Sequence, residues 1–334
     1  MLKKPLRGVV PPAITPMIDN DTLDVLGLEN LLNRMVAGGI SGVFILGTTG
    51  EAQNISYQVR KELIKHTCRI IDGRIQVLVG VTDTSFPESL SLAVVAAEHG
   101  ADALVCAPPY YYTPGDDELI QYYNHLSKRL PLPLFLYNMP ANVKISIKPQ
   151  IVQQLSENPN IVGLKDSSAN GTYIRQVVYL LRNNPEFSML IGPEEMLAES
   201  VLMGVHGGVN GGANLFPELY VSLYNAAVNR DFEKIEQLQN RVMEVSLSLY
   251  NIGRFASSYI KGIKSALNLL GICNDYMAEP FHKFEDRERN IVKEKLIKLG
   301  VLNKENRILF NNNNLINHDE FQNKYLQNGQ IKIT

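Results

Sequence analysis

The stretch Ile161-Val162-Gly163-Leu164-Lys165-Asp166 decides the fold of this chain: a short apolar run ends abruptly in a charged pair. Continuous apolarity, in place of alternation, is typical of strands that are buried on both faces of a parallel sheet. Seven other segments repeat the pattern, and each ends in glycine, proline, threonine or a polar residue. These other runs begin at Gly8, Gly42, Ile75, Ala103, Leu132, Ser188 and Gly207.

Amphipathic segments separate the apolar runs and predict helices. Polar caps such as Asp24 and Ser56 stand at their starts, and glycines such as Gly73 and Gly100 follow their ends. Strands that alternate with helices in this way predict a (β/α)8 barrel, because right-handed crossovers close the series on itself. An open doubly wound sheet is the alternative. The predicted helices cover residues 24–37, 56–72, 87–99, 116–129, 148–156, 172–183 and 194–203.

The pattern changes at Phe216 to helices alone, which we predict over residues 218–229, 232–253, 254–270 and 285–299. We therefore divide the chain into a catalytic barrel over residues 1–228, a C-terminal helical domain over 229–302, and a polar, asparagine-rich tail over 303–334. The tail has too few aliphatic residues to order a core of its own. We expect it to be loosely attached or held by a partner subunit.

Charge and composition exclude several classes of protein. The chain has 32 basic and 34 acidic side chains, a balance that argues against nucleic acid as the main partner. It has no apolar run long enough to cross a membrane, and prolines stand where a signal peptide would need apolar residues, so we expect a cytoplasmic protein without a membrane partner. Its 3 cysteines form no CxxC pair and its histidines show no metal-ligand spacing, so we predict no metal.

The polar residues that end the apolar runs are the candidate catalytic groups, since barrel enzymes carry their chemistry at the carboxyl ends of strands. Lys165 at the rim of an apolar interior would have a lowered pKa and an available amine nucleophile. The alternative is a lysine that reaches solvent or pairs with Asp166. Tyr137 ends the neighbouring run, so its phenol is expected within hydrogen-bond reach of Lys165, although a tyrosine in a barrel layer is often only packing.

The turn Gly47-Thr48-Thr49-Gly50 supplies two hydroxyl groups and several backbone N–H groups. Such a turn suits a small carboxylate, and it lacks the Gly-Lys-Ser/Thr ending of a nucleotide-binding loop. A turn whose threonines merely cap a helix is the alternative interpretation. Together, an amine nucleophile, a phenol and a carboxylate site predict a Schiff-base enzyme that acts on a 2-keto acid.

Four motifs give the chain a family resemblance: Gly47–Glu51, Pro109–Tyr111, Tyr137–Pro140 and Gly163–Asp166. In their residues, order and spacing, the chain resembles the dihydrodipicolinate synthase and N-acetylneuraminate lyase family, the pyruvate-dependent class I aldolases, over about residues 5–300. The resemblance implies a barrel enzyme that makes or breaks a carbon–carbon bond next to an imine. It also implies that no metal and no organic cofactor is needed.

The resemblance assigns roles to individual residues. It implies that Lys165 forms the imine with pyruvate, that Thr48 and Thr49 hold the carboxylate, and that Tyr137 is the general acid/base. Thr48 and Tyr111 would complete a proton relay. In the family, the tyrosine that matches Tyr111 is often contributed by a neighbouring subunit, which implies a homo-oligomer, a dimer or a tetramer.

One departure from the family bears on the second substrate. Synthases that condense aspartate semialdehyde with pyruvate usually carry an arginine two residues after the proline of the Tyr-Asn-x-Pro motif, where it grips a carboxylate. This chain has Asn142 there. An amide does not replace a bidentate guanidinium, so the resemblance favours another second substrate.

The segment after the seventh run looks more like the sugar-acid lyases. In sialate lyases an acidic pair after the glycine binds hydroxyl groups of the sugar chain, and Glu194 and Glu195 follow Gly192 here. The alternative for the pair is simple stabilisation of a helix N-terminus. We add Val209 and Asn210 as substrate-binding candidates, although sialate lyases carry a hydroxyl side chain where this chain has Gly211.

The sequence thus predicts a lyase that cleaves a 2-keto-3-deoxy sugar acid or a sialate-like substrate to pyruvate and an aldehyde. Its small-molecule partners would be pyruvate and a small aldehyde or keto acid. The alternatives are a 4-hydroxy-tetrahydrodipicolinate synthase, a keto-deoxy acid dehydratase and, in a different class, a catalytically silent ligand-binding barrel.

Overall fold

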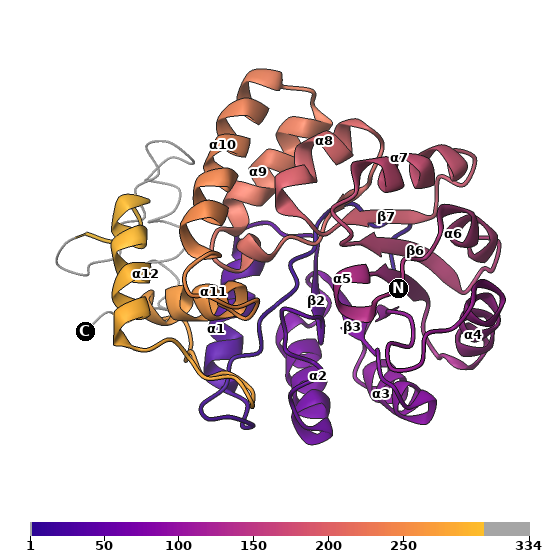
Figure 1. Cartoon of the computed structure of the whole chain (residues 1–334), viewed down its shortest axis with the longest axis horizontal. Coiled ribbons are helices and arrows are strands. Elements are labelled where there is room, and N and C mark those ends of the chain that lie inside the picture. Colours follow the sequence, from indigo (N-terminus) through magenta and orange to yellow (C-terminus); the bar gives the residue numbers. More distant parts are fainter. Residues whose placement is uncertain (1, 304–334) are drawn as a thin grey trace.

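The computed structural model describes residues 2–303, and it confirms the predicted barrel (Figure 1). Eight parallel strands form one sheet in the order β1-β8-β7-β6-β5-β4-β3-β2. The predicted tail, from residue 304 onward, lies outside the described residues. The strands are β1 (Gly8–Val9), β2 (Gly42–Ile45), β3 (Gln76–Gly80), β4 (Ala103–Cys106), β5 (Leu134–Asn138), β6 (Ile161–Asp166), β7 (Ser188–Ile191) and β8 (Gly207–Gly208).

Between β1 and β2 the barrel closes without a regular ladder. The segment after β1 carries Pro11 and Pro12, which have no N–H group to donate to a sheet. Closure uses the groups that remain: the Phe44 N–H donates to the Pro11 carbonyl at 2.9 Å, and the Ala13 N–H donates to the Phe44 carbonyl at 2.9 Å. A single parallel bridge between Pro12 and Phe44 marks this seam.

The helices of the barrel follow the predicted segments to within a few residues. Ser56 caps α2, where its hydroxyl accepts a hydrogen bond from the Val59 N–H, and Asp24 caps α1 in the same way. The short helix α5 was not predicted. These helices are α1 (Val25–Ala37), α2 (Tyr57–Ile71), α3 (Phe86–Glu98), α4 (Asp116–Arg129), α5 (Pro140–Val143), α6 (Pro149–Leu155), α7 (Gly171–Leu180), α8 (Leu197–Leu202) and α9 (Pro217–Val228).

The C-terminal helices α10 (Phe232–Leu249), α11 (Ser258–Leu269) and α12 (Asp286–Lys298) gather on one side of the barrel (Figure 1). The predicted helices over residues 232–253 and 254–270 are too long, because residues 250–257 form turns instead. One continuous apolar core extends from Leu6 in the barrel to Leu302 after α12. The C-terminal helices are therefore packed onto the barrel and do not form a detached module.

Two expectations from the sequence concern membrane-spanning helices and disulfide bonds. Within residues 2–303, no helix combines the length and the apolarity that crossing a membrane requires. The cysteines Cys68, Cys106 and Cys273 are all buried, and none of them forms a disulfide.

Candidate active site

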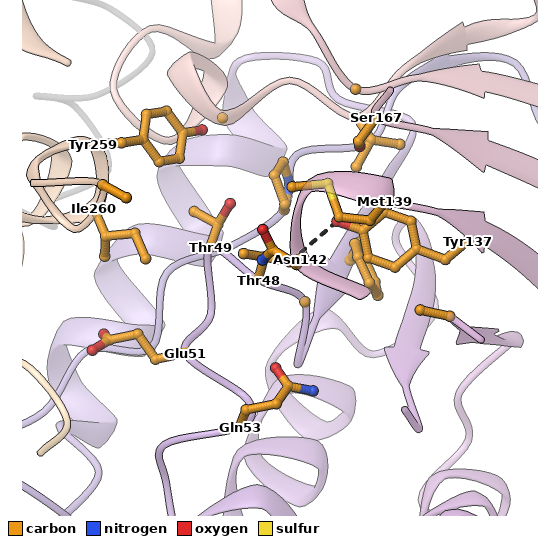
Figure 2. Close-up of a pocket in the computed structure, with 18 of the residues that line it drawn as sticks. Thr48, Thr49, Glu51, Gln53, Tyr137, Met139, Asn142, Ser167, Tyr259 and Ile260 are labelled. Atoms are coloured by element: carbon orange, nitrogen blue, oxygen red, sulfur yellow. Dashed lines mark hydrogen bonds between the residues drawn. The ribbon is translucent and has the colours of Figure 1, made fainter. Parts of the chain in front are cut away.

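A cavity of about 730 Å³ opens at the carboxyl ends of the strands, where a barrel of this kind carries its chemistry. Residues that follow β2, β5, β6 and β7 line it, and residues of α11 close one side. Figure 2 shows Thr48 and Thr49 between Tyr137 on one side and Tyr259 on the other. The cavity thus joins the predicted strand-end residues to the C-terminal helices.

Lys165 lies at the end of β6 with its side chain inside the barrel and only 5% exposed. Its strand partner across the ladder is Tyr137 of β5. The Lys165 ammonium lies 4.1 Å from the centroid of the Tyr137 ring and 4.7 Å from that of Phe44. Burial lowers the pKa of Lys165, and the Tyr137 phenol opposes this shift only in part. The neutral, nucleophilic amine is therefore easier to form here than in water.

Asp166 does not pair with Lys165, because successive residues of a strand point to opposite faces. Its carboxylate accepts hydrogen bonds from the Asn138 amide at 2.8 Å and from the Ser168 hydroxyl at 3.0 Å. The ion-pair alternative for Lys165 is wrong, as is the alternative that this lysine extends into solvent.

Tyr137 and Thr48 are in direct contact. The Tyr137 hydroxyl lies 3.2 Å from the Thr48 hydroxyl, and either oxygen can donate the hydrogen bond (Figure 2). Tyr137 is 6% exposed, and its ring meets Phe44 edge-on. This geometry gives the phenol a defined orientation toward Lys165 and a hydroxyl neighbour with which it can exchange a proton.

The Gly47–Gly50 turn presents unused donors to the cavity. The N–H groups of Gly50, Glu51 and Ala52 donate to carbonyls within the turn. Those of Thr48 and Thr49 donate to no other residue in the described part of the chain, and both residues line the cavity. Two N–H groups are thus available to a small anion, and the hydroxyls of the same two threonines lie beside them.

Residues with left-handed backbone stand at both ends of this turn: Leu46 has φ 56° and Glu51 has φ 55°. Each such residue costs on the order of 1–3 kcal/mol, so neighbouring structure must hold it in place. Part of the support comes from Thr15, whose hydroxyl donates to the Gly50 carbonyl at 2.7 Å. Gly80 gives the Leu46 carbonyl the room it needs, since a Cβ there would lie 2.0 Å from that oxygen.

Glu194 lines the cavity but is 4% exposed, and protein groups already use its carboxylate. The Tyr220 and Tyr250 hydroxyls donate to one oxygen at 2.5 and 2.6 Å, and the Gly212 N–H donates to the other at 2.8 Å. Burial raises the pKa of Glu194 to about 7, although these three hydrogen bonds oppose the rise. The neighbouring Glu195 also lines the cavity, and it accepts a hydrogen bond from Ser246 at 2.6 Å.

The other predicted site residues fall into two groups. Gly192 and Val209 line the cavity. Asn210 is fully buried outside the lining and donates from its amide to the Gly192 carbonyl at 3.1 Å, so it supports the wall from behind. Tyr111 is 77% exposed and also lies outside the lining, to which its neighbour Tyr110 contributes.

Sequence reasoning missed the residues that the C-terminal helices contribute. Tyr250, Tyr259 and Ile260 all line the cavity. The hydroxyl of Tyr259 reaches the wall beside Gly211, where a Cβ would lie 1.5 Å from it, so glycine there makes room for the tyrosine. The only sign of these residues in the sequence is the spacing of apolar residues along α11. This spacing predicts which face of the helix is buried but not what that face contacts.

A parallel eight-stranded barrel with a buried lysine beside a tyrosine at its carboxyl-terminal mouth is the arrangement that a class I aldolase requires. A sequence model of the "Dihydrodipicolinate synthetase family" matches residues 5–299, and this chain belongs to that family. The protein is therefore a pyruvate-dependent carbon–carbon lyase of the kind that forms a lysine imine. The alternative of a catalytically silent barrel has no support.

Individual relatives agree with the family assignment. A 4-hydroxy-tetrahydrodipicolinate synthase from Methanocaldococcus jannaschii is 27% identical over 89% of this chain and 99% of its own. The solved structure of a dihydrodipicolinate synthase from Bacteroides thetaiotaomicron is 56% identical over 89% of this chain and 100% of its own, with a TM-score of 0.87. A prophage protein of the family from E. coli K12, solved in complex with pyruvate, is 26% identical over 88% and 99%, with a TM-score of 0.83.

Proposed function

We propose that this protein cleaves a 2-keto-3-deoxy sugar acid or a sialate-like substrate to pyruvate and an aldehyde, through an imine at Lys165. Thr48 and Thr49 bind the substrate carboxylate with their hydroxyl and N–H groups. Tyr137 moves protons at the reacting carbons. The reaction needs no metal and no organic cofactor, because the protonated imine itself withdraws electrons.

The first half of the reaction forms the imine. The neutral amine of Lys165 attacks the C2 carbonyl of the substrate, and the resulting carbinolamine loses water to give a protonated imine. The lowered pKa of the lysine favours the free amine that this attack requires. Water leaves with a proton supplied by the Tyr137 phenol, which lies beside the lysine on the adjacent strand.

The second half breaks the C3–C4 bond. Tyr137, now a phenolate, removes the proton of the C4 hydroxyl, and the bonding electrons move into the imine to form an enamine while the aldehyde leaves. Protonation of the enamine at C3 and hydrolysis of the imine then release pyruvate and restore the amine. Thr48, at 3.2 Å from the phenol, relays the proton between these steps, with Tyr111 of a neighbouring subunit as a further member.

One observation carries the substrate assignment: among the described residues that line the cavity, Lys165 is the only basic one. The lining offers amides, hydroxyls and carboxylates, among them Gln53, Asn142, Ser167 and Glu195. Such groups exchange hydrogen bonds with a hydroxylated chain, whereas a second substrate carboxylate would favour a guanidinium. The lining therefore supports a polyhydroxylated aldehyde as the second product.

A second candidate function is 4-hydroxy-tetrahydrodipicolinate synthesis, which the names of the relatives favour. In that reaction the pyruvate enamine would attack an amino aldehyde that carries its own carboxylate. Asn142 in the cavity lining speaks against it, because an amide binds a carboxylate less strongly than an arginine does.

Two measurements test the proposal. Borohydride reduction in the presence of pyruvate should leave a stable three-carbon adduct on Lys165, and an adduct on another lysine would refute the mechanism. Pyruvate release should then be measured from a panel of keto-deoxy sugar acids that includes sialate, in parallel with condensation of pyruvate and aspartate semialdehyde. Turnover of the semialdehyde alone would replace the lyase assignment with the synthase.

A further inference from the structure

An ion pair buried behind the cavity links α11 to the Gly47–Gly50 turn. The ammonium of Lys264, from the middle of α11, pairs with the carboxylate of Glu51, the residue directly after the turn. Both side chains are sealed from solvent, with exposures of 0% and 2%. Glu51 lines the cavity, while Lys264 does not (Figure 2 shows Glu51 below Thr49).

Backbone groups of the C-terminal segment complete the arrangement. The Lys264 ammonium also donates to the Tyr276 carbonyl at 2.6 Å. The second oxygen of Glu51 accepts a hydrogen bond from the Ala278 N–H at 2.9 Å. Glu51 is thus held by its charge and by a directional hydrogen bond, and the segment after α11 is held by the same two side chains.

The position of Glu51 gives these contacts a mechanical consequence. Its φ of 55° is a left-handed conformation that a residue with a side chain adopts only when neighbouring structure enforces it. Relaxation of Glu51 to an ordinary φ would move the preceding residues, among them Thr48 and Thr49, which carry the unused N–H groups. The side-chain contacts of Glu51 oppose that relaxation.

Stability alone is a weak explanation for such a pair. Removing two charges from water is costly, and apolar residues of similar volume often serve a core as well or better. A buried pair does fix the mutual placement of the two segments that carry it, because leaving either charge without its partner is strongly unfavourable. The pair joins a strained turn of the barrel to the helix that also supplies Tyr259 and Ile260 to the cavity wall.

We propose that Glu51 and Lys264 are positioning residues, which lock the Gly47–Gly50 turn in the shape that binds the substrate carboxylate. The C-terminal helix α11 is then a working part of the active site and not an appendage. This inference rests on the proposed role of Thr48 and Thr49 in carboxylate binding, so its test needs one readout that does not involve pyruvate.

The experiment uses the full chain with Lys264→Met, Glu51→Gln and Glu51→Gly. Methionine keeps most of the lysine volume without its charge. Glutamine keeps an acceptor for the Ala278 N–H but removes the charge, and glycine allows the left-handed backbone but removes the side chain. The matched control is Arg60→Met, which breaks another buried ion pair, at 3.0 Å with Asp83, outside the turn.

The first readout is the pyruvate concentration that gives half-maximal borohydride labelling. We expect all three variants to raise it at least about tenfold while labelling still reaches completion, because a displaced turn weakens binding without removing the amine. Arg60→Met should leave it unchanged. Unchanged half-saturation in Lys264→Met, or normal binding by Glu51→Gly, would overturn the proposal.

The second readout is hydrogen exchange of the turn amides of Gly50, Glu51 and Ala52, measured by mass spectrometry without pyruvate. We expect faster exchange there in Lys264→Met than in Arg60→Met. Equal protection in the two variants would overturn the inference. If wild-type protein is not labelled by pyruvate at all, the proposed function fails, while this readout still decides the positioning role.

The double variant Glu51→Gln/Lys264→Met separates positioning from stability. It removes the unpaired carboxylate that Lys264→Met leaves behind, so its thermal stability should recover above that of the single variant. Pyruvate binding should not recover with it. Recovery of both together would show that the pair serves only to stabilise the fold.

Discussion

The carboxyl group of Glu194 should make the stability of this enzyme fall as the pH rises from about 4.5 to about 7. Burial raises its pKa from 4.5 to about 7, so between these values the folded state binds more protons than the unfolded state does. The free energy of unfolding therefore decreases as pH increases over this window and levels off above it. The shift corresponds to a loss of about 3 kcal/mol, because each pKa unit is worth about 1.4 kcal/mol.

Glu194→Gln isolates this contribution, since an amide does not titrate. Urea unfolding of wild type and variant, followed by circular dichroism at fixed protein concentration from about pH 5 to about pH 8, gives both profiles. The wild type should lose about 2.5 kcal/mol more than the variant over that range, because part of the total loss occurs below pH 5. The control Glu195→Gln leaves Glu194 in place and should keep nearly the wild-type slope, because the charge of Glu195 is the smallest cause of the raised pKa. Parallel profiles for wild type and Glu194→Gln would refute the buried-carboxyl reasoning.

Other predictions concern the reaction, the Gly47–Gly50 turn and the choice of the second substrate. Tyr137→Phe should lower kcat by about 10²- to 10⁴-fold, because it removes the proposed general acid/base, yet still allow slow borohydride trapping of pyruvate; full activity would exclude the phenol from proton transfer. The rate of imine formation at Lys165 should rise with pH and level off below pH 10.5, since burial lowers this pKa, and stopped-flow trapping measures the plateau. Gly80→Ala would place a Cβ 2.0 Å from the Leu46 carbonyl, so weaker pyruvate binding is expected, and wild-type half-saturation would contradict the close contact. Asn142→Arg should increase condensation with aspartate semialdehyde relative to sugar-acid cleavage, and an unchanged ratio of the two activities would show that this position does not select the second substrate.

Much of the fold could be predicted because its rules are local. A strand that is buried on both faces is apolar over most of its length, and β4 and β6 can be recognised in the sequence for this reason. Helix α4 begins and ends at the predicted residues, since acidic residues start it and basic residues end it. The strand-end rule also brought Lys165 and Tyr137 together correctly, because adjacent parallel strands end at the same edge of the barrel.

The boundary between α10 and α11 was predicted at Gly253, but the length of the turn region that separates the two helices could not be predicted. Helical spacing continues through residues 250–257, yet the chain turns there, with Gly253 at φ 101°, and this turn supplies Ala256 and Ser257 to the cavity. The early end of α10 and the late start of α11 let α11 reach the cavity, and this long-range contact is not encoded in the local spacing of residues.

Glu194 illustrates the same limit in the site itself. Its place after a strand end predicted a carboxylate facing the ligand, and it does line the cavity. Its hydrogen-bond partners Tyr220 and Tyr250 come from α9 and from the end of α10, however, and they determine how much of that carboxylate remains available.

The sequence by itself determined the barrel, the order of its elements and the amine, phenol and hydroxyl groups at its mouth. The spacing of neighbouring residues shows which strands are buried and where each strand ends. Only the tertiary structure decided which distant groups meet: Tyr259 beside Gly211, and Lys264 on Glu51. A buried face on α11 is visible in the spacing of its residues, but its partner is chosen by the three-dimensional packing of segments far apart in the chain.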